Sequence, residues 1–178
     1  QPLEQYYRDA RIHPIHEGTT GIQGLDLLGR KVMMRGGKAF GLFGEEVRKT
    51  ISQAIGEEPL RPHADALEQA LTLLEEVTGH LKNVAAKGGP ALFLADATLY
   101  LKLFGIVAIA WQWLKQGVIL VKGLDGAALE KEKNFYQGKL YTLRFFFAYE
   151  LPKMGGLAER LMNGDGLTVE MQEAFFKD

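Results

Sequence analysis

One short polar segment of this chain has residue types that could take part in catalysis. It contains Glu17, a carboxylate that can accept a proton, followed by the small residues 18–21. Thr20 and Gln23 have the spacing of a capping box, which predicts that a helix begins near Thr20. The turn before a helix offers free backbone N–H groups and a positive dipole end, and both favour a bound phosphate. The segment therefore predicts a carboxylate in the turn directly before a helix start, and that helix start could bind an anion.

The same segment has two other interpretations. Pro14 disfavours helical geometry at His13, so a helix is expected to end near Arg11 and a polar turn to follow it. In a plain turn, Glu17 would be a solvated surface carboxylate before a well-capped helix. His13 and His16 could form a metal pair, but Pro14 lies between them and no clear set of carboxylates accompanies them. We therefore expect no metal site here.

Apolar residues recur three or four positions apart through most of the chain, which is typical of amphipathic helices. One stripe predicts a helix that ends at residues 88–90, and a second predicts a long helix from about Ala91 to Val121. The stripes consist of Leu67, Leu71, Leu74, Val77, Leu81 and Val84, and of Leu99, Leu103, Val107, Ala110 and Leu114.

Weaker patterns predict three more helices. The first covers Lys38 to Ile55, and the second runs from roughly Ala127 to Leu151 and is broken or kinked by Pro152. A short last helix is expected between Thr168 and Phe176. A linker at residues 35–37 precedes the first of these helices.

Short connections predict how the helices are arranged. The glycine-containing links at 88–90 and 123–126 leave little room to cross the molecule, which favours antiparallel neighbours. We therefore predict an all-α protein dominated by an antiparallel helical bundle built from residues 38–163. No substantial β-sheet is expected within that span.

The stretch from Leu103 to Leu114 is apolar enough to raise the question of a membrane span. A spanning helix needs about 20 consecutive apolar residues. Here Asp96, Lys102, Gln112 and Lys115 interrupt the run, so its apolar part is too short. We expect a buried helix of the bundle and no membrane span.

Composition narrows the class of protein. The chain has 178 residues, 47% hydrophobic and 24% charged, which is ordinary for a globular protein and excludes wholesale disorder. The formal charge of −1 argues against nucleic acid as a partner. Because there is no cysteine, disulfides and thiolate chemistry are excluded, in keeping with an intracellular protein. No signal peptide or initiating Met is present, and we expect an internal or C-terminal piece of a longer protein.

The residues around Glu17 resemble the signature near the C-terminus of acyl-CoA dehydrogenases. The similarity runs through residues 8–12, 15–19 and 22–23, with several positions agreeing in order and spacing. His16 stands where that family usually has Tyr, beside the base in the acyl pocket, so the difference bears on substrate preference.

A second, less specific resemblance lies further along the chain. Residues 134–140 and 145–152 are similar to the extra C-terminal helical domain of the longer acyl-CoA dehydrogenases, which include enzymes acting on 3-methylthiopropanoyl-CoA. The resemblance divides the chain at its first linker. Residues 1–35 would be the end of the dehydrogenase's C-terminal helical domain with the catalytic-base loop, and residues 38–178 the extra helical-bundle domain.

The resemblance implies an FAD-dependent oxidoreductase of fatty acid metabolism that forms a 2,3-double bond in an acyl-CoA. Glu17 would be the catalytic base that removes the α-proton, while a hydride passes to FAD. Gly18 would contact the substrate, and Thr19, Thr20 and Gly21 would contact FAD.

Further expectations follow from the same resemblance. The partners would be the acyl-CoA substrate, an electron-transfer flavoprotein or similar acceptor, and further copies in a dimer or tetramer, in the cytoplasm. Most of the flavin and CoA site would lie outside this chain, so the chain alone is expected to be inactive and to hold no FAD. The alternative is a non-catalytic helical module for oligomerisation or interaction, in which Glu17 belongs only to a turn.

Overall fold

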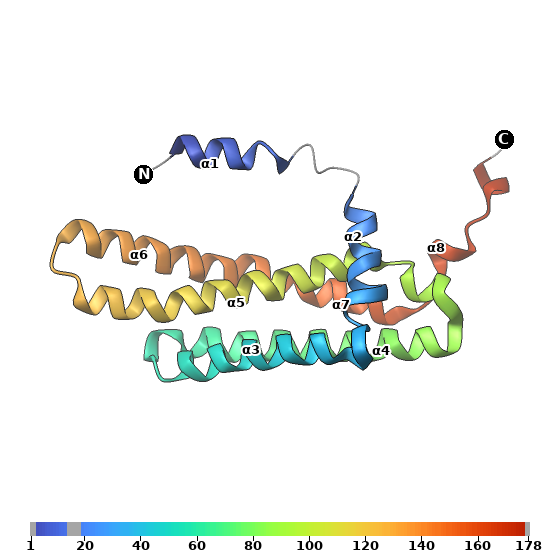
Figure 1. Cartoon of the computed structure of the whole chain (residues 1–178), viewed down its shortest axis with the longest axis horizontal. Coiled ribbons are helices and arrows are strands. Elements are labelled where there is room, and N and C mark those ends of the chain that lie inside the picture. Colours follow the sequence, from blue (N-terminus) through green and yellow to red (C-terminus); the bar gives the residue numbers. More distant parts are fainter. Residues whose placement is uncertain (1–2, 14–18, 177–178) are drawn as a thin grey trace.

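The computed structural model describes residues 3–13 and 19–176, and every element in these ranges is helical (Figure 1). No strand occurs among them, which confirms the predicted all-α class. The α-helices are α1 (Leu3–Ala10), α2 (Thr20–Asp26), α3 (Lys38–Ile55), α4 (Arg61–Leu94), α5 (Ala97–Gly126), α6 (Glu130–Phe145), α7 (Met154–Asn163) and α8 (Leu167–Glu170). Short π or 3-10 segments are η2 (Leu27–Lys31), η3 (Met34–Gly37), η4 (Glu58–Leu60), η5 (Phe146–Glu150), η6 (Leu151–Lys153) and η7 (Glu173–Phe176).

The long helices run back and forth beside one another. In Figure 1, α3 lies along α4 and α5 lies along α6, and the two pairs are joined by packing between α4 and α5. α7 packs against both α4 and α5, while α2 crosses the bundle and packs on α5. The antiparallel bundle predicted for residues 38–163 is therefore confirmed.

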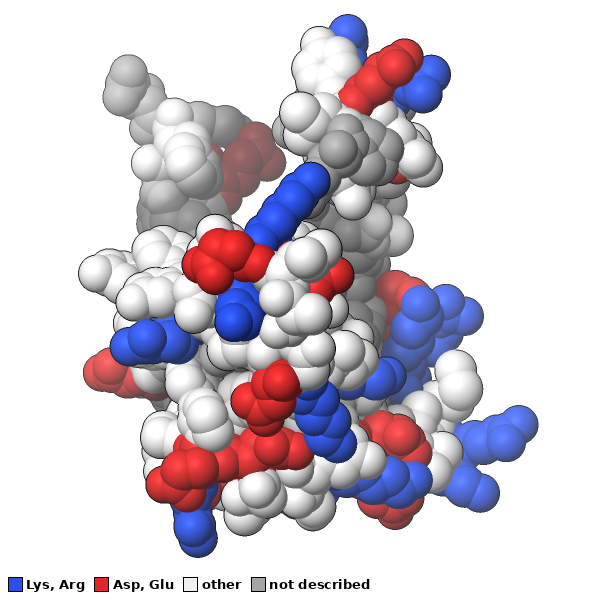
Figure 2. Space-filling model, turned by 90° about the vertical axis from the view of Figure 1, so that its left-hand side faces the viewer, with Lys and Arg blue, Asp and Glu red and all other residues white. Residues whose placement is uncertain are grey.

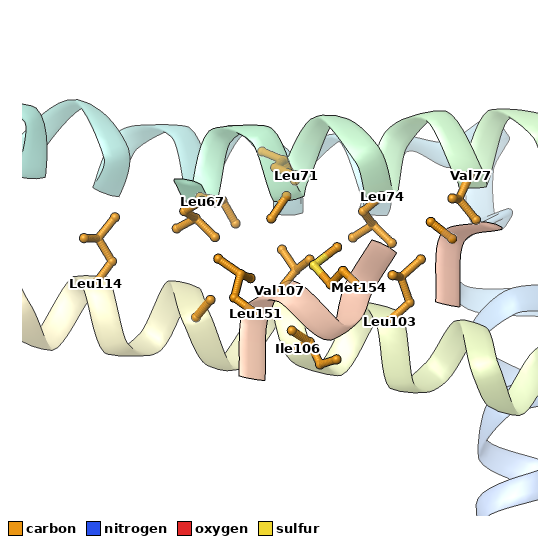
Figure 3. Close-up of a cluster of buried hydrophobic side chains, with 14 of the residues drawn as sticks. Leu67, Leu71, Leu74, Val77, Leu103, Ile106, Val107, Leu114, Leu151 and Met154 are labelled. Carbon is orange, nitrogen blue, oxygen red and sulfur yellow. The ribbon is translucent and has the colours of Figure 1, made fainter. Parts of the chain in front are cut away.

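The core of the bundle lies where α4 and α5 face each other, with η6 and α7 closing one side (Figure 3). Both predicted apolar stripes point into it. Of their residues only Val84 and Leu99 are partly exposed, because each lies near the end of its stripe. The labelled core side chains are Leu67, Leu71, Leu74 and Val77 of α4, Leu103, Ile106, Val107 and Leu114 of α5, and Leu151 and Met154.

The boundary between α4 and α5 differs from the prediction. Gly89 has φ 81° and ψ 174°, which kinks the helix where the glycines predicted its end. Pro90 then begins a new helical turn, at a position where its missing N–H costs nothing, and the helix continues to Leu94. The predicted start of the second helix at Ala91 is therefore wrong, since α5 begins at Ala97.

The later helices also differ in their boundaries. α6 begins at Glu130 rather than near Ala127, and the N–H of Leu129 bonds to the Glu132 carboxylate at 3.3 Å. The break predicted at Pro152 is confirmed, because the chain there passes from a π-helical turn into a 3-10 turn. Where one short last helix was expected between Thr168 and Phe176, the structure has two short helical segments. Met171 is extended, with ψ 124°, and separates α8 from η7.

Hydrogen bonds inside the bundle tie its helices together. The hydroxyls of Thr78 and Tyr100 lie 2.7 Å apart between α4 and α5, and Thr78 also donates to the Leu74 carbonyl. Burial raises the pKa of Tyr100 to about 12, although the hydrogen bond with Thr78 lowers it. The indole of Trp111 donates to the Thr50 hydroxyl at 2.8 Å, linking α5 to α3. Each of these polar groups thus has a partner, as buried groups require.

Two glycines let α5 and α6 approach closely. A Cβ on Gly117 would lie 2.7 Å from a methyl carbon of Leu143, and one on Gly123 would lie 2.7 Å from the Tyr136 ring. Both distances are too short for any side chain without movement of the neighbours. The close packing of α6 on α5 therefore depends on these two positions.

α5 is the one helix in the described part of the chain that is long and apolar enough to span a membrane by length and composition. Tyr100, Leu103, Val107, Ala110 and Leu114 on this helix are completely buried between its neighbours. This burial supports the interpretation of α5 as the central helix of the bundle.

Charged side chains cover the end of the molecule that carries the α3–α4 and α5–α6 connections. Figure 2 looks onto this end and shows basic and acidic groups interspersed over it.

Candidate active-site loop and its support

The structure describes only part of the predicted site. Glu17 and Gly18, the proposed base and substrate contact, lie outside the described residues, as does His16. Thr19, Thr20 and the glycine after them are described, and all three are exposed at the start of α2. These three residues, 19–21, are called the α2 rim below.

The start of α2 differs in detail from the predicted capping box. The helix begins at Thr20, so Thr19 is the N-cap residue, and Gln23 is the fourth residue after it rather than the third that a capping box needs. Instead, the Gln23 N–H bonds to the Thr19 carbonyl at 2.8 Å, and its side-chain amide donates to the Thr19 hydroxyl at 3.2 Å. The Thr20–Gln23 box is therefore wrong, but the predicted helix start is confirmed.

α2 packs closely against the first turn of α5. A Cβ built on Gly24 would lie 2.8 Å from the Ala97 carbonyl oxygen and 3.0 Å from the Thr98 nitrogen. Backbone atoms cannot turn aside as a flexible side chain can, so only a residue without a side chain allows this approach. Further along, Leu28 and Val32 are buried in the bundle core. The bundle thus fixes the direction of α2 and, through it, the position of the α2 rim.

The outer face of α2 is charged and partly apolar. Asp26 pairs with Arg30 and lies 3.3 Å from Lys31. The hydrogen bond from Arg30 holds the pKa of Asp26 below its usual value, despite an opposing contribution from burial. Ile22 and Leu25 remain 69% and 46% exposed. Contacts of its buried face alone therefore hold α2 against the bundle.

α1 makes little contact with the rest of the described chain and contains no buried residue. Arg8, which belongs to the motif, lies 3.8 Å from Glu4 in an exposed pair of the kind that contributes little to stability. Leu3, Tyr6 and Tyr7 are all exposed. We assign no chemistry to Arg8.

The α2 rim is compatible with part of a bound FAD. A Cβ on Gly21 would meet no heavy atom within 4 Å, so the space beside it is open. The first N–H groups of any helix lack partners within the helix and can bind a phosphate or hydroxyl oxygen. Residues 19–21 therefore fit an edge of the cofactor. The described residues contain no cluster of three or more side chains that could hold a metal ion.

A family model described as "Acetyl-CoA dehydrogenase C-terminal like" matches residues 43–172, most of the bundle. The chain belongs to the acyl-CoA dehydrogenase family. This confirms the family expected from the sequence around Glu17. The matched residues lie beyond that segment, so the family model and the motif are separate observations.

Curated acyl-CoA dehydrogenases are similar to the chain over almost its whole length. A broad-specificity linear acyl-CoA dehydrogenase of Mycobacterium tuberculosis is 30% identical over 98% of the chain and 30% of its own length. The 3-methylmercaptopropionyl-CoA dehydrogenase of Ruegeria pomeroyi is 33% identical over 93% of the chain and 28% of its own. A butyryl-CoA dehydrogenase of Syntrophomonas wolfei is 25% identical over 95% of the chain and 28% of its own. The chain thus spans less than a third of the length of these relatives.

Two features of the structure were not found from the sequence. The contact of Gly24 with the backbone of Ala97 joins residues that are more than seventy positions apart, and no local pattern marks it. A groove between α4 and α6, which includes His63 and Arg144, likewise combines distant residues. Neither feature could have been found without the packing of the helices.

Proposed function

We propose that this chain is the C-terminal part of an FAD-dependent acyl-CoA dehydrogenase that forms a 2,3-double bond in an acyl-CoA thioester. The observation that carries the proposal is the 30% identity to a broad-specificity linear acyl-CoA dehydrogenase over 98% of the chain, Glu17 segment included. The resemblance of residues 8–23 to the family's catalytic signature agrees with it.

In this proposal Glu17 is the general base. Its carboxylate takes the α-proton of the thioester, and its backbone N–H donates a hydrogen bond to the thioester carbonyl. Exclusion of water on substrate binding would raise the carboxylate pKa and so strengthen the base. Gly18 has no side chain to obstruct the acyl-CoA.

The cofactor is held in part by the α2 rim. Thr19, Thr20 and Gly21 present small polar groups and backbone N–H groups at the helix start. When bound, FAD supplies the redox chemistry by accepting the β-hydrogen as a hydride. Because α2 is fixed on α5 at Gly24, these residues hold a constant position relative to the bundle.

The proposal extends to the setting of the enzyme. We infer a cytoplasmic flavoprotein of fatty acid metabolism that forms a dimer or tetramer and passes electrons to an electron-transfer flavoprotein or a similar acceptor. The 178-residue chain alone would be inactive and would bind no FAD, since a flavin ring needs protein on both faces. Flavin absorbance in the purified chain, or FAD released on denaturation, would contradict this.

The test is Glu17→Gln in the full-length protein that carries this chain. The rate of flavin reduction by a saturating acyl-CoA is measured as the loss of flavin absorbance in a stopped-flow instrument. This rate should fall by several orders of magnitude, at or beyond the upper end of general-base effects, which is about 10⁴-fold. FAD content and acyl-CoA binding should change little, because the amide is nearly isosteric and the backbone N–H remains. A His16→Tyr control should keep its bleaching rate within about tenfold while the preferred chain length shifts.

A non-catalytic helical module remains the second candidate. It is favoured by one observation, namely that the family model matches residues 43–172 and omits Glu17. Under this alternative, acyl-CoA would reduce the flavin of the Glu17→Gln variant at a near-normal rate, and the catalytic base would lie elsewhere.

A further inference from the structure

A groove runs between the start of α4 and the second half of α6 with η5, and large aromatic side chains line it. It consists of two adjoining hollows of about 510 and 560 Å³ that share His63, Tyr141 and Arg144. Tyr141 is 67% exposed, and the rings of Phe145 and Tyr149 stack at 4.6 Å on the surface. We call this surface the α4–α6 groove. The lining residues that matter below are His63, Tyr141, Arg144, Phe145 and Tyr149.

Arg144 is the one lysine or arginine among the residues that line the groove. The Arg144 guanidinium lies 5.1 Å from the centre of the Tyr141 ring and has no ion-pair partner among the described residues. None of the lining residues is acidic. Exposed arginine and tyrosine next to apolar rings are the residue types that dominate the binding energy of protein interfaces. The groove is therefore suited to an aromatic segment that carries acidic groups.

The chain itself contains such a segment. Residues 167–176, called the distal segment here, form α8 and η7 and include no buried residue. Their apolar side chains are exposed, up to 75% for Phe176, and the segment also carries Glu170 and Glu173. The exposed apolar residues are Leu167, Val169, Met171, Phe175 and Phe176. Several large apolar groups in one short exposed segment mark a surface that is covered by something.

The distal segment cannot reach the groove of its own copy in this arrangement. Arg160 fixes the start of the segment, since it bonds to Asp165 at 2.7 Å and to Asp96 at 3.2 Å, at the far end of α4. His63 and Lys87 alone are separated by roughly 36 Å of helix. The ten residues of the segment would have to unwind fully, to roughly 35 Å, to cover that distance. Figure 1 shows the segment at the opposite end from the α3–α4 connection.

We propose that the distal segment of one copy docks in the α4–α6 groove of a second copy, and that the exchange is reciprocal. Phe175 and Phe176 pack on the exposed rings of Tyr141 and its neighbours, and the acidic groups of the segment face Arg144. A reciprocal exchange about a two-fold axis closes the assembly as a dimer, whereas a one-way exchange would produce open chains. This interface does not depend on the catalytic role of Glu17.

The first experiment measures the mass of the 178-residue chain by sedimentation velocity over a range of concentrations. The wild-type chain should be a dimer, and Phe176→Ala should raise the dimer dissociation constant about thirtyfold or more, as expected for an interface hot spot. Arg144→Glu should raise it about tenfold or more. Lys102→Glu, the same charge change on the exposed side of α5, should leave it unaltered. Circular dichroism checks that each variant keeps its helices.

The second experiment tests the pairing directly. Arg144→Glu combined with Glu170→Lys and Glu173→Lys in one chain should restore the dimer that Arg144→Glu alone weakens. A peptide of residues 165–176 should compete with the exchange and release monomers. A chain that is monomeric at high concentration, or a dimer that neither Phe176→Ala nor Arg144→Glu affects, would overturn the proposal. So would a groove that binds a small aromatic anion while the chain stays monomeric.

Discussion

The bundle and the segment that precedes it are stabilised in opposite ways. Between them, α4 and α5 bury two continuous apolar stripes, and Leu67, Leu74 and Leu103 have no exposed surface. By contrast, the described residues from 3 to 26 bury only one position, Gly24. The part of the chain with the best-packed core carries none of the proposed chemistry, and the proposed chemistry lies in the part with almost no core.

This difference indicates how the two regions depend on each other. The bundle draws its stability from its own contacts, whereas the α2 rim takes its position from a single close approach to α5. Catalytic residues are commonly found on segments that a rigid scaffold positions. Substitutions in the bundle should therefore alter the stability of the protein. Substitutions at Gly24, where α2 contacts α5, should alter the position of α2.

The largest stability effect should come from the core. Leu74→Ala removes a fully buried side chain and leaves a cavity, so it should lower the free energy of unfolding by about 2–5 kcal/mol. Leu25→Ala, on the exposed face of α2, should change it by no more than about 0.5 kcal/mol. Urea unfolding followed by circular dichroism measures both. Equal losses at the two positions would mean that the outer face of α2 is covered.

A substitution at Gly24, where α2 contacts α5, should have an intermediate effect on stability that is confined mainly to α2. Gly24→Val places a side chain against the backbone of Ala97 and should cost about 1–3 kcal/mol, expressed mainly as faster hydrogen exchange in α2. Gly105→Val is the matched control, because a Cβ there meets no heavy atom within 4 Å. If both variants exchange alike in α2, the Gly24 contact does not hold the helix.

Inside the bundle, Tyr100→Phe should cost about 1 kcal/mol at neutral pH, since it removes one hydrogen bond to Thr78. It should also change the response to alkali. The unfolded tyrosine ionises near pH 10, whereas burial raises the pKa of Tyr100 to about 12 in the folded protein. Stability from this group is thus complete below pH 10 and is lost as the pH rises through 12. Urea midpoints from pH 8 to 12 should fall less steeply in the variant than in the wild-type chain.

The smallest effect belongs to the α2 rim. Thr20→Ala should change the free energy of unfolding by less than about 0.5 kcal/mol, because Thr20 is exposed and is not the N-cap residue. A loss near 1 kcal/mol in a thermal or urea titration would instead support the capping box predicted from the sequence.

The sequence predicts the bundle well because its information is local. The apolar spacing from Leu67 to Leu81 identifies a buried helical face, and the bounds of α3 agree with the pattern from Lys38 to Ile55. Helix ends are harder to predict, since Gly89 kinks α4 without ending it. A glycine and a proline mark a possible break, but tertiary packing decides whether the helix resumes.

The site is predicted less completely, for a similar reason. A motif locates residues 19–21 at a helix start, yet it does not decide which of two neighbouring threonines is the N-cap residue. The contact that positions α2 joins Gly24 to Ala97 and has no local signal. The roles of Glu17 and Gly18 stay predictions until the proposed kinetics are measured.

The order of the helices also has a consequence for how fast the bundle forms. α3, α4 and α5 each pack against the next helix along the chain, so the loops that join these neighbours are short. Proteins dominated by such local contacts fold in microseconds to milliseconds. Longer loops are closed where α2 packs on α5 and where α7 returns to both α4 and α5 across the intervening α6. We expect α7 to dock after the transition state for folding, so mutations such as Met154→Ala should speed unfolding far more than they slow folding.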